Sequence, residues 1–151
     1  MLVECYGSMT MRIGRRGEYG LAAILFLATQ PEGKLSLREE IARRCGIPHA
    51  FLAQILARLR RKGILGSVRG KKGGYYLKAE PNRLSLADVL EALEGPITLI
   101  REIQTDETGE TDFVKTTVKD FFGRLQTRGY DLLKSMKIAD ILPSQHGKPV
   151  K

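Results

Sequence analysis

The hydrophobic positions in the middle of the chain change period twice. Apolar residues recur every three or four positions over 36–45 and again over 48–62, which indicates two amphipathic helices. The Cys-Gly-Ile-Pro run at 45–48 favours a tight turn between them. Two short apolar stretches, 64–68 and 75–77, then flank a glycine-rich loop and predict a β-hairpin, called the wing below. The order predicts a winged helix-turn-helix.

Helical patterns also precede and follow this segment. Residues 15–29 have a broad apolar face, and 85–94 begins with Ser-Leu-Ala-Asp and ends before Gly-Pro, which are helix start and stop signals. Ser36 and Glu39 have the same spacing, so a capping box is predicted at the start of 36–45 as well. The fold class expected is mainly α with a small β-hairpin.

We expect the chain to divide into five parts. They are a disordered extension (1–10), a winged helix-turn-helix domain (11–96), a loop (97–111), a long helix with a short C-terminal element (112–142) and a flexible tail (143–151). A chain of 151 residues is long enough for one domain with a real core.

The charge balance favours a polyanionic partner. The chain has 25 Lys and Arg against 17 Asp and Glu, a net charge of +8. Seven of the basic residues lie between Arg58 and Lys72, where there is no acid. No run of about eighteen apolar residues exists, so no transmembrane helix and no membrane partner are expected. A signal-peptide pattern is missing too, and a cytoplasmic location is expected.

The second helix of the pair, 48–62, carries candidates for base contact. Its apolar stripe must face a core, which leaves the opposite face to project outward. That face holds Ala50, Gln54, Ala57, Arg58 and Arg61. Gln and Arg can hydrogen-bond to base edges in a major groove, and small residues let the backbone approach. For His49, at the helix start, DNA contact and a solvated side chain are both open.

Two further basic groups favour phosphate contact. Arg69, Lys71 and Lys72 stand among glycines at the tip of the wing, which suits contact with the DNA backbone or minor groove. Arg15, Arg16 and Tyr19 lie in the first turn of 15–29, where free backbone N–H groups suit a phosphate. The alternative for this turn is a solvated basic start to a core helix.

The apolar stripe of 112–136 needs a partner surface, because a helix of that length exceeds what one small domain covers. A second copy of the chain satisfies it best, so this is predicted to be a dimerisation helix. The dimer residues expected are Val118, Phe121, Phe122, Leu125, Leu132 and Leu133. The alternative is a helix that lies on its own winged domain, which the preceding loop is long enough to allow.

Short motifs between residues 11 and 96 resemble the Rrf2 family of bacterial transcription regulators. They are Met11-Arg12-Ile13, Gly17-Glu18-Tyr19, Ile41-Ala42, Gly46-Ile47, Phe51-Leu52-Ala53-Gln54-Ile55-Leu56, Leu59-Arg60, Lys62-Gly63, Val68-Arg69-Gly70, Gly73-Gly74-Tyr75, Leu86-Ala87-Asp88-Val89 and Glu94-Gly95-Pro96. The resemblance covers more than half of the chain. It implies a homodimer that binds double-stranded DNA at a palindromic operator.

The sequence also departs from the family pattern. Many members of the family that this chain resembles share three cysteines that hold an iron–sulfur cluster. In this chain, residues 97–111 contain neither Cys nor His. No cofactor and no metal site are therefore expected, and a solvated acidic loop is favoured over a carboxylate site at Asp106, Glu107 and Glu110. Ala53 replaces an acid common in relatives, so their operator preference is not transferred.

Cys45 has two interpretations. Beside Arg43 and Arg44, its thiol could have a lowered pKa and act as a redox switch. It could equally be a small buried hydrophobic residue. No arrangement typical of an enzyme is found, so the chain is expected to be a transcription regulator without enzyme activity. The alternative is a protein-interaction scaffold with vestigial DNA binding, and a protein effector is open as a further partner.

Overall fold

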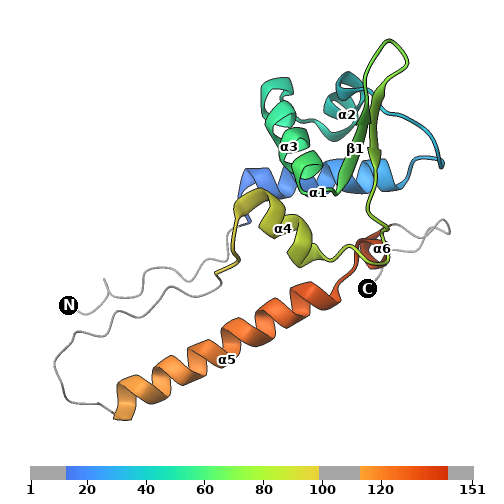
Figure 1. The fold of residues 1–151 in the computed structure, drawn as a ribbon. Coiled ribbons are helices and arrows are strands. Elements are labelled where there is room, and N and C mark those ends of the chain that lie inside the picture. Colours follow the sequence, from blue (N-terminus) through green and yellow to red (C-terminus); the bar gives the residue numbers. More distant parts are fainter. Residues whose placement is uncertain (1–12, 99–112, 143–151) are drawn as a thin grey trace.

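The computed structural model describes residues 13–98 and 113–142, and these contain six helices and one hairpin (Figure 1). In chain order the elements are α1 (Arg15–Ala28), α2 (Arg38–Cys45), α3 (His49–Arg61), β1 (Leu65–Val68), β2 (Gly74–Leu77), α4 (Leu86–Glu94), α5 (Phe113–Ser135) and α6 (Ile138–Ile141). The predicted class, mainly α with a small hairpin and a long C-terminal helix, is confirmed. The predicted extension 1–10, the tail 143–151 and most of the loop 97–111 lie outside the described residues.

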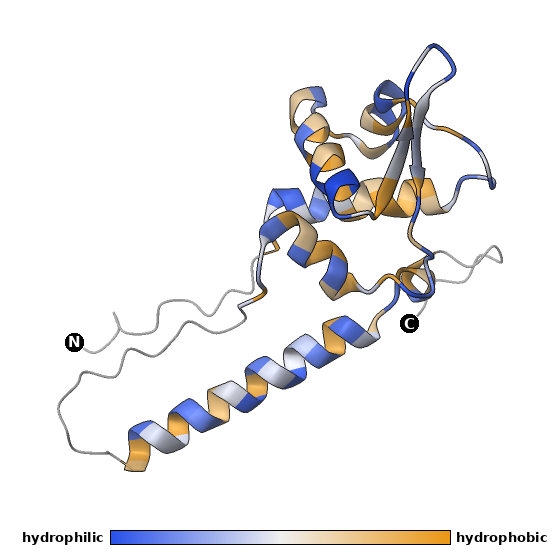
Figure 2. Cartoon of the chain, viewed as in Figure 1, coloured by the Kyte–Doolittle hydropathy of each residue, from blue (hydrophilic) through white to orange (hydrophobic). Residues whose placement is uncertain are grey.

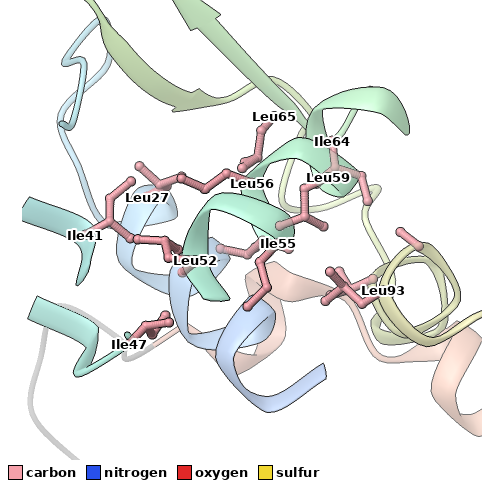
Figure 3. Close-up of a cluster of buried hydrophobic side chains, with 14 of the residues drawn as sticks. Leu27, Ile41, Ile47, Leu52, Ile55, Leu56, Leu59, Ile64, Leu65 and Leu93 are labelled. Atoms are coloured by element: carbon pink, nitrogen blue, oxygen red, sulfur yellow. The ribbon is translucent and has the colours of Figure 1, made fainter. Parts of the chain in front are cut away.

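The core forms around the apolar face of α3. Leu52, Ile55, Leu56 and Leu59 are completely buried. Figure 3 shows them gathered with Leu27 of α1, Ile41 of α2, Leu65 of β1 and Leu93 of α4. Full burial of one such side chain contributes about 1.5–3 kcal/mol. This packing fixes α3 on the domain and leaves its opposite face outside.

The wing is joined to the helix-turn-helix by a third stretch of backbone. β1 and β2 pair antiparallel, with Leu65 opposite Leu77. On the other edge of β2, Tyr75 exchanges two hydrogen bonds with Ser36, of 2.8 and 2.9 Å between N and O. The predicted capping box at Ser36 is therefore wrong: Ser36 is extended and buried, and α2 begins at Arg38 with no side-chain cap.

The same sequence signal is confirmed at α4. The Ser85 hydroxyl accepts from the backbone N–H of Asp88 at 3.1 Å, and the Asp88 carboxylate accepts from the N–H of Ser85 at 2.9 Å. Lys134 of α5 forms an ion pair with the same carboxylate. α4 lies between the helix-turn-helix and α5, and it contacts both (Figure 1).

Within 13–98 and 113–142, α5 contacts the rest of the chain through its C-terminal half, where Gln126 also donates to the carbonyl of Ile97 at 2.9 Å. Leu133 is buried with Leu86, Ala87 and Leu90 of α4, so its assignment to a dimer face is wrong. Next to it, Leu132 is 61% exposed. Apolar bands recur along the rest of α5, which extends away from the winged domain (Figure 2). None of the helices in 13–98 and 113–142 is long and apolar enough to cross a membrane.

Candidate nucleic-acid interface

The outer face of α3 is open to solvent and has no acidic residue. Its exposed residues include His49, Ala50, Gln54, Ala57 and Arg61. Ala50, Gln54, Ala57 and Arg61 lie opposite the four buried positions because α3 turns by about 100° per residue, whereas His49 is exposed at the start of the helix. The helix therefore presents one amide, one guanidinium and small side chains on a surface that a major groove can accommodate.

Arg58 differs from this group. It is half-buried, and its Nη1 donates to the backbone carbonyl of Leu93 at 3.3 Å. Leu93 lies in the last turn of α4, whose carbonyls lack partners within the helix and attract cations. At about 100° per residue, Arg58 falls at the edge of the outer face rather than at its centre. The expectation that Arg58 projects outward with Gln54 and Arg61 is therefore corrected.

The first turn of α1 already forms hydrogen bonds with the end of α4. The Gly17 N–H donates to Glu94 Oε1 at 2.8 Å, and Arg16 Nη1 donates to the carbonyl of Leu93 at 3.4 Å. The expectation of a free N–H for a phosphate is thus wrong at Gly17. Arg15 stays exposed.

Tyr19, predicted to contact DNA, packs against α3. Its ring meets that of Phe51 edge to face, with 5.5 Å between the centroids. It is half-buried, so part of its surface is still accessible. The contact supports the start of α3, where His49 and Ala50 lie.

The tip of the wing holds three exposed cations, Arg69, Lys71 and Lys72. Within 13–98 and 113–142 none of them has an acidic partner. A bond of 3.0 Å from the Gly73 N–H to the carbonyl of Gly70 closes the turn. A side chain at Gly73 would clash with the backbone of Val68, so glycine is required there. The tip is a fixed cationic loop, which suits phosphate contact.

The surroundings of Cys45 bear on its two interpretations. Burial raises the pKa of Cys45, and the opposing effect of Arg44 is smaller. Sγ lies 3.7 Å from the carbonyl of Ala22 and is half-buried. Of the two interpretations, the small buried residue is therefore favoured over the thiol with a lowered pKa.

An apolar stripe is exposed along α5. Phe121 is 62% exposed and Leu132 61%, while Val118 and Leu125 are about as open as each other at 40% and 41%. Phe122 is half-buried and meets Phe121 edge to face, with 5.6 Å between centroids. The prediction did not include Phe113, although it is the most exposed of the apolar residues on α5.

The contacts at the end of α4 were not predicted from the sequence. Glu94 and Gly17 both belong to family-like motifs, but they lie 77 positions apart. No local spacing indicates that one side chain reaches the other. Their motifs were the only available signal.

Comparisons with known proteins agree with this arrangement. The profile of the Rrf2 family, described as an iron-dependent transcriptional regulator, matches residues 13–144. The HTH-type transcriptional regulator CymR of Bacillus subtilis is 32% identical over 114 residues, which are 73% of this chain and 82% of that protein.

Two solved structures extend the similarity to the fold. The structure of CymR, the global cysteine regulator of B. subtilis, has a TM-score of 0.72 and 26% identity, and covers 87% of this chain and 96% of that one. IscR of T. potens has a TM-score of 0.68 and 28% identity, with 89% and 88% covered. The chain therefore belongs to the Rrf2 family, and it is a DNA-binding transcription regulator.

Proposed function

We propose that this chain acts as a homodimer on a palindromic operator, with one α3 in each of two major-groove segments. The observation that carries the proposal is the acid-free outer face of α3 next to the wing cations, which have no acidic partner in the described part of the chain. The exposed stripe of α5 supports the dimer, since an isologous pair would cover Phe121 and Leu125 on both chains. A twofold dimer matches a palindrome because each half-site meets the same surface.

Residues on α3 would divide the contacts between bases and phosphates. Gln54 can bind adenine through N6 and N7, and the methyl groups of Ala50 and Ala57 can contact thymine. Arg61, in the last turn, can reach guanine or a phosphate. Ala53 has no acceptor for the amino group of cytosine, so the base preference should differ from that of relatives with an acid there.

We infer that regulation does not use a family-type iron–sulfur cluster. Such clusters are held by thiolates, and the sequence has two cysteines. Of these, Cys45 is half-buried with a raised pKa. Within the described residues, no three His, Cys, Asp or Glu side chains come together as metal ligands. The donor set does not fit the group, so the signal that controls DNA binding differs from the cluster.

The test is a salt titration with a duplex that the full chain selects from a random library. Six wing cations in a dimer predict a slope of about −5 in log affinity against log salt. Lys71→Ala with Lys72→Ala removes four of them and should make the slope shallower by about 3 or 4. Lys78→Ala, an exposed lysine at the other end of β2, is the matched control and should change it little.

Two results would overturn the proposal. A wild-type slope near zero would exclude phosphate contact by the wing. Binding of a partner protein that survives nuclease treatment, in a chain without DNA affinity, would instead favour a protein-interaction scaffold.

A further inference from the structure

We propose that Arg58 is a positioning residue: it holds the recognition helix α3 against the end of α4 and so sets the spacing of the two half-sites. The inference rests on the homodimer proposed above. It assigns Arg58 a role in operator choice without contact to DNA.

Three elements meet at the last turn of α4. The carbonyl oxygen of Leu93 accepts from Arg58 Nη1 of α3 at 3.3 Å and from Arg16 Nη1 of α1 at 3.4 Å. The next residue, Glu94, accepts from the N–H of Gly17 in α1 at 2.8 Å. Arg16 and Arg58 thus bind the C-terminus of α4, and Glu94 of α4 binds the N-terminus of α1. Both arrangements are favourable, because a helix C-terminus attracts positive charge and an N-terminus negative charge.

The packing beneath these bonds leaves α4 little room to shift. A Cβ atom on Gly20 of α1 would lie 2.1 Å from Cδ1 of Leu93, which is completely buried. On Gly17 it would lie 3.1 Å from Cδ2 of Leu90. α1 and α4 are therefore closely packed against each other. Arg58 adds a polar contact between α3 and this pair of helices.

α4 also carries α5, the helix with the exposed stripe. Leu133 packs on Leu86, Ala87 and Leu90 of α4, and Lys134 pairs with Asp88. The path from α3 to the exposed stripe thus runs from α3 to α4, through the apolar packing on Leu93 and the bond of Arg58, and from α4 to α5. If α3 tilts on α4, the distance between the two recognition helices of a dimer changes, and half-site spacing follows that distance.

Arg61 offers a matched comparison one turn further along the same helix. It is exposed, and it has no hydrogen-bond or ion-pair partner within 13–98 and 113–142. Arg58→Met and Arg61→Met make the same chemical change, so a difference between them reports the position of the side chain.

The experiment selects duplexes from a random library with the full-length wild type and both variants, then titrates the wild-type duplex at several salt concentrations. Wild type should select paired half-sites at one spacing. Arg58→Met should select the same half-sites at two or more spacings, bind the wild-type duplex about tenfold more weakly and keep the salt slope. Arg61→Met should keep the single spacing and either make the slope shallower by about 2 or lose one base preference in each half-site.

A conservative variant separates positioning from general loss of stability. Arg58→Lys retains a cation near the carbonyl of Leu93 and should restore the single spacing, whereas lower stability alone would not change the spacing that folded protein selects. Thermal unfolding confirms that each variant is folded. If Arg58→Met does not fold, Arg58→Gln takes its place with the same expected broadening.

The outcomes distinguish this inference from the proposed function. If Arg58→Met keeps one spacing and loses a base preference or salt slope as Arg61→Met does, Arg58 touches DNA and the inference is wrong, while the proposed function stands. If wild type selects single half-sites or none, the homodimer on a palindrome is wrong and the inference falls with it.

Discussion

Helices α3 and α5 both carry an apolar stripe, but residues 13–98 and 113–142 cover only one of the two. In α3 the stripe residues Leu52, Ile55, Leu56 and Leu59 have no exposed surface. In α5 Phe121 and Leu132 each expose more than half of theirs. The first stripe is therefore satisfied by folding, and we expect the second to be satisfied by association. Substitutions in the stripe of α5 should therefore have effects that depend on protein concentration, and substitutions in the stripe of α3 should not.

α5 itself has one side that is covered by its own domain and one side that is exposed. At about 100° per residue, Val118, Phe121, Leu125 and Leu132 fall within about 60° of one another. Tyr130 and Leu133 are turned away from them and pack on α4. One side of α5 belongs to its own domain, and the other is open over most of the helix.

Leu56→Ala should give the largest effect, because it opens a cavity in a completely buried site. We expect the free energy of unfolding to fall by about 3 kcal/mol at any protein concentration, measured by urea unfolding. Gln54→Ala, on the exposed side of the same helix, should change it by less than about 0.5 kcal/mol. Equal losses in both variants would contradict the division of α3 into a core face and an outer face.

Phe121→Ala should have the next largest effect, on association. A central aromatic residue of an interface contributes about 2 kcal/mol, so the dimer dissociation constant should rise about 30-fold. Sedimentation velocity over a range of concentrations measures it. Asp120→Ala, an exposed neighbour on another side of α5, serves as control. A dissociation constant that Phe121→Ala leaves unchanged would place the interface elsewhere.

Asp88→Asn should have the smallest effect, and that effect should depend on pH. Burial on its own raises the pKa of Asp88, but hydrogen bonds from Lys134 and Ser85 together outweigh it and lower the pKa from 3.8 to about 2. A carboxyl whose pKa is lower in the folded state stabilises the protein above its ordinary pKa and loses that contribution as pH falls towards 2.

At pH 7 the variant should therefore be less stable than wild type by about 1 kcal/mol, the usual contribution of a helix cap. Urea unfolding at a series of pH values measures the difference, which should shrink below pH 3.8. A difference that stays constant down to pH 2 would show that the charge of Asp88 contributes nothing.

Local patterns in the sequence predicted most of the elements, and the errors occur where distant parts of the chain meet. Ser85 and Ser36 both start a motif with an acid three residues on, yet only Ser85 caps a helix. Ser36 differs because its backbone pairs with Tyr75, which no nearby residue indicates. The charge and periodicity of α3 identified its outer face. They could not show that Arg58 bonds to Leu93, 35 positions away.

Leu132 and Leu133 illustrate the same limit. Both fit the helical period of α5, and both were assigned to the dimer face. Only the docking of α4 distinguishes the buried leucine from the exposed one. Periodicity identifies a stripe, but the surface that covers it depends on tertiary packing.

The pairing of Ser36 with Tyr75 has a consequence for the nucleic acid. Because β2 is bonded on both edges, to β1 and to Ser36 two residues before α2, the wing is held rigidly against the helix-turn-helix. If α3 and the wing contact DNA as proposed, this rigid pair cannot adapt to local changes in groove width, and the duplex has to deform instead. We therefore expect base steps that never touch the protein to contribute to operator choice through how easily they bend.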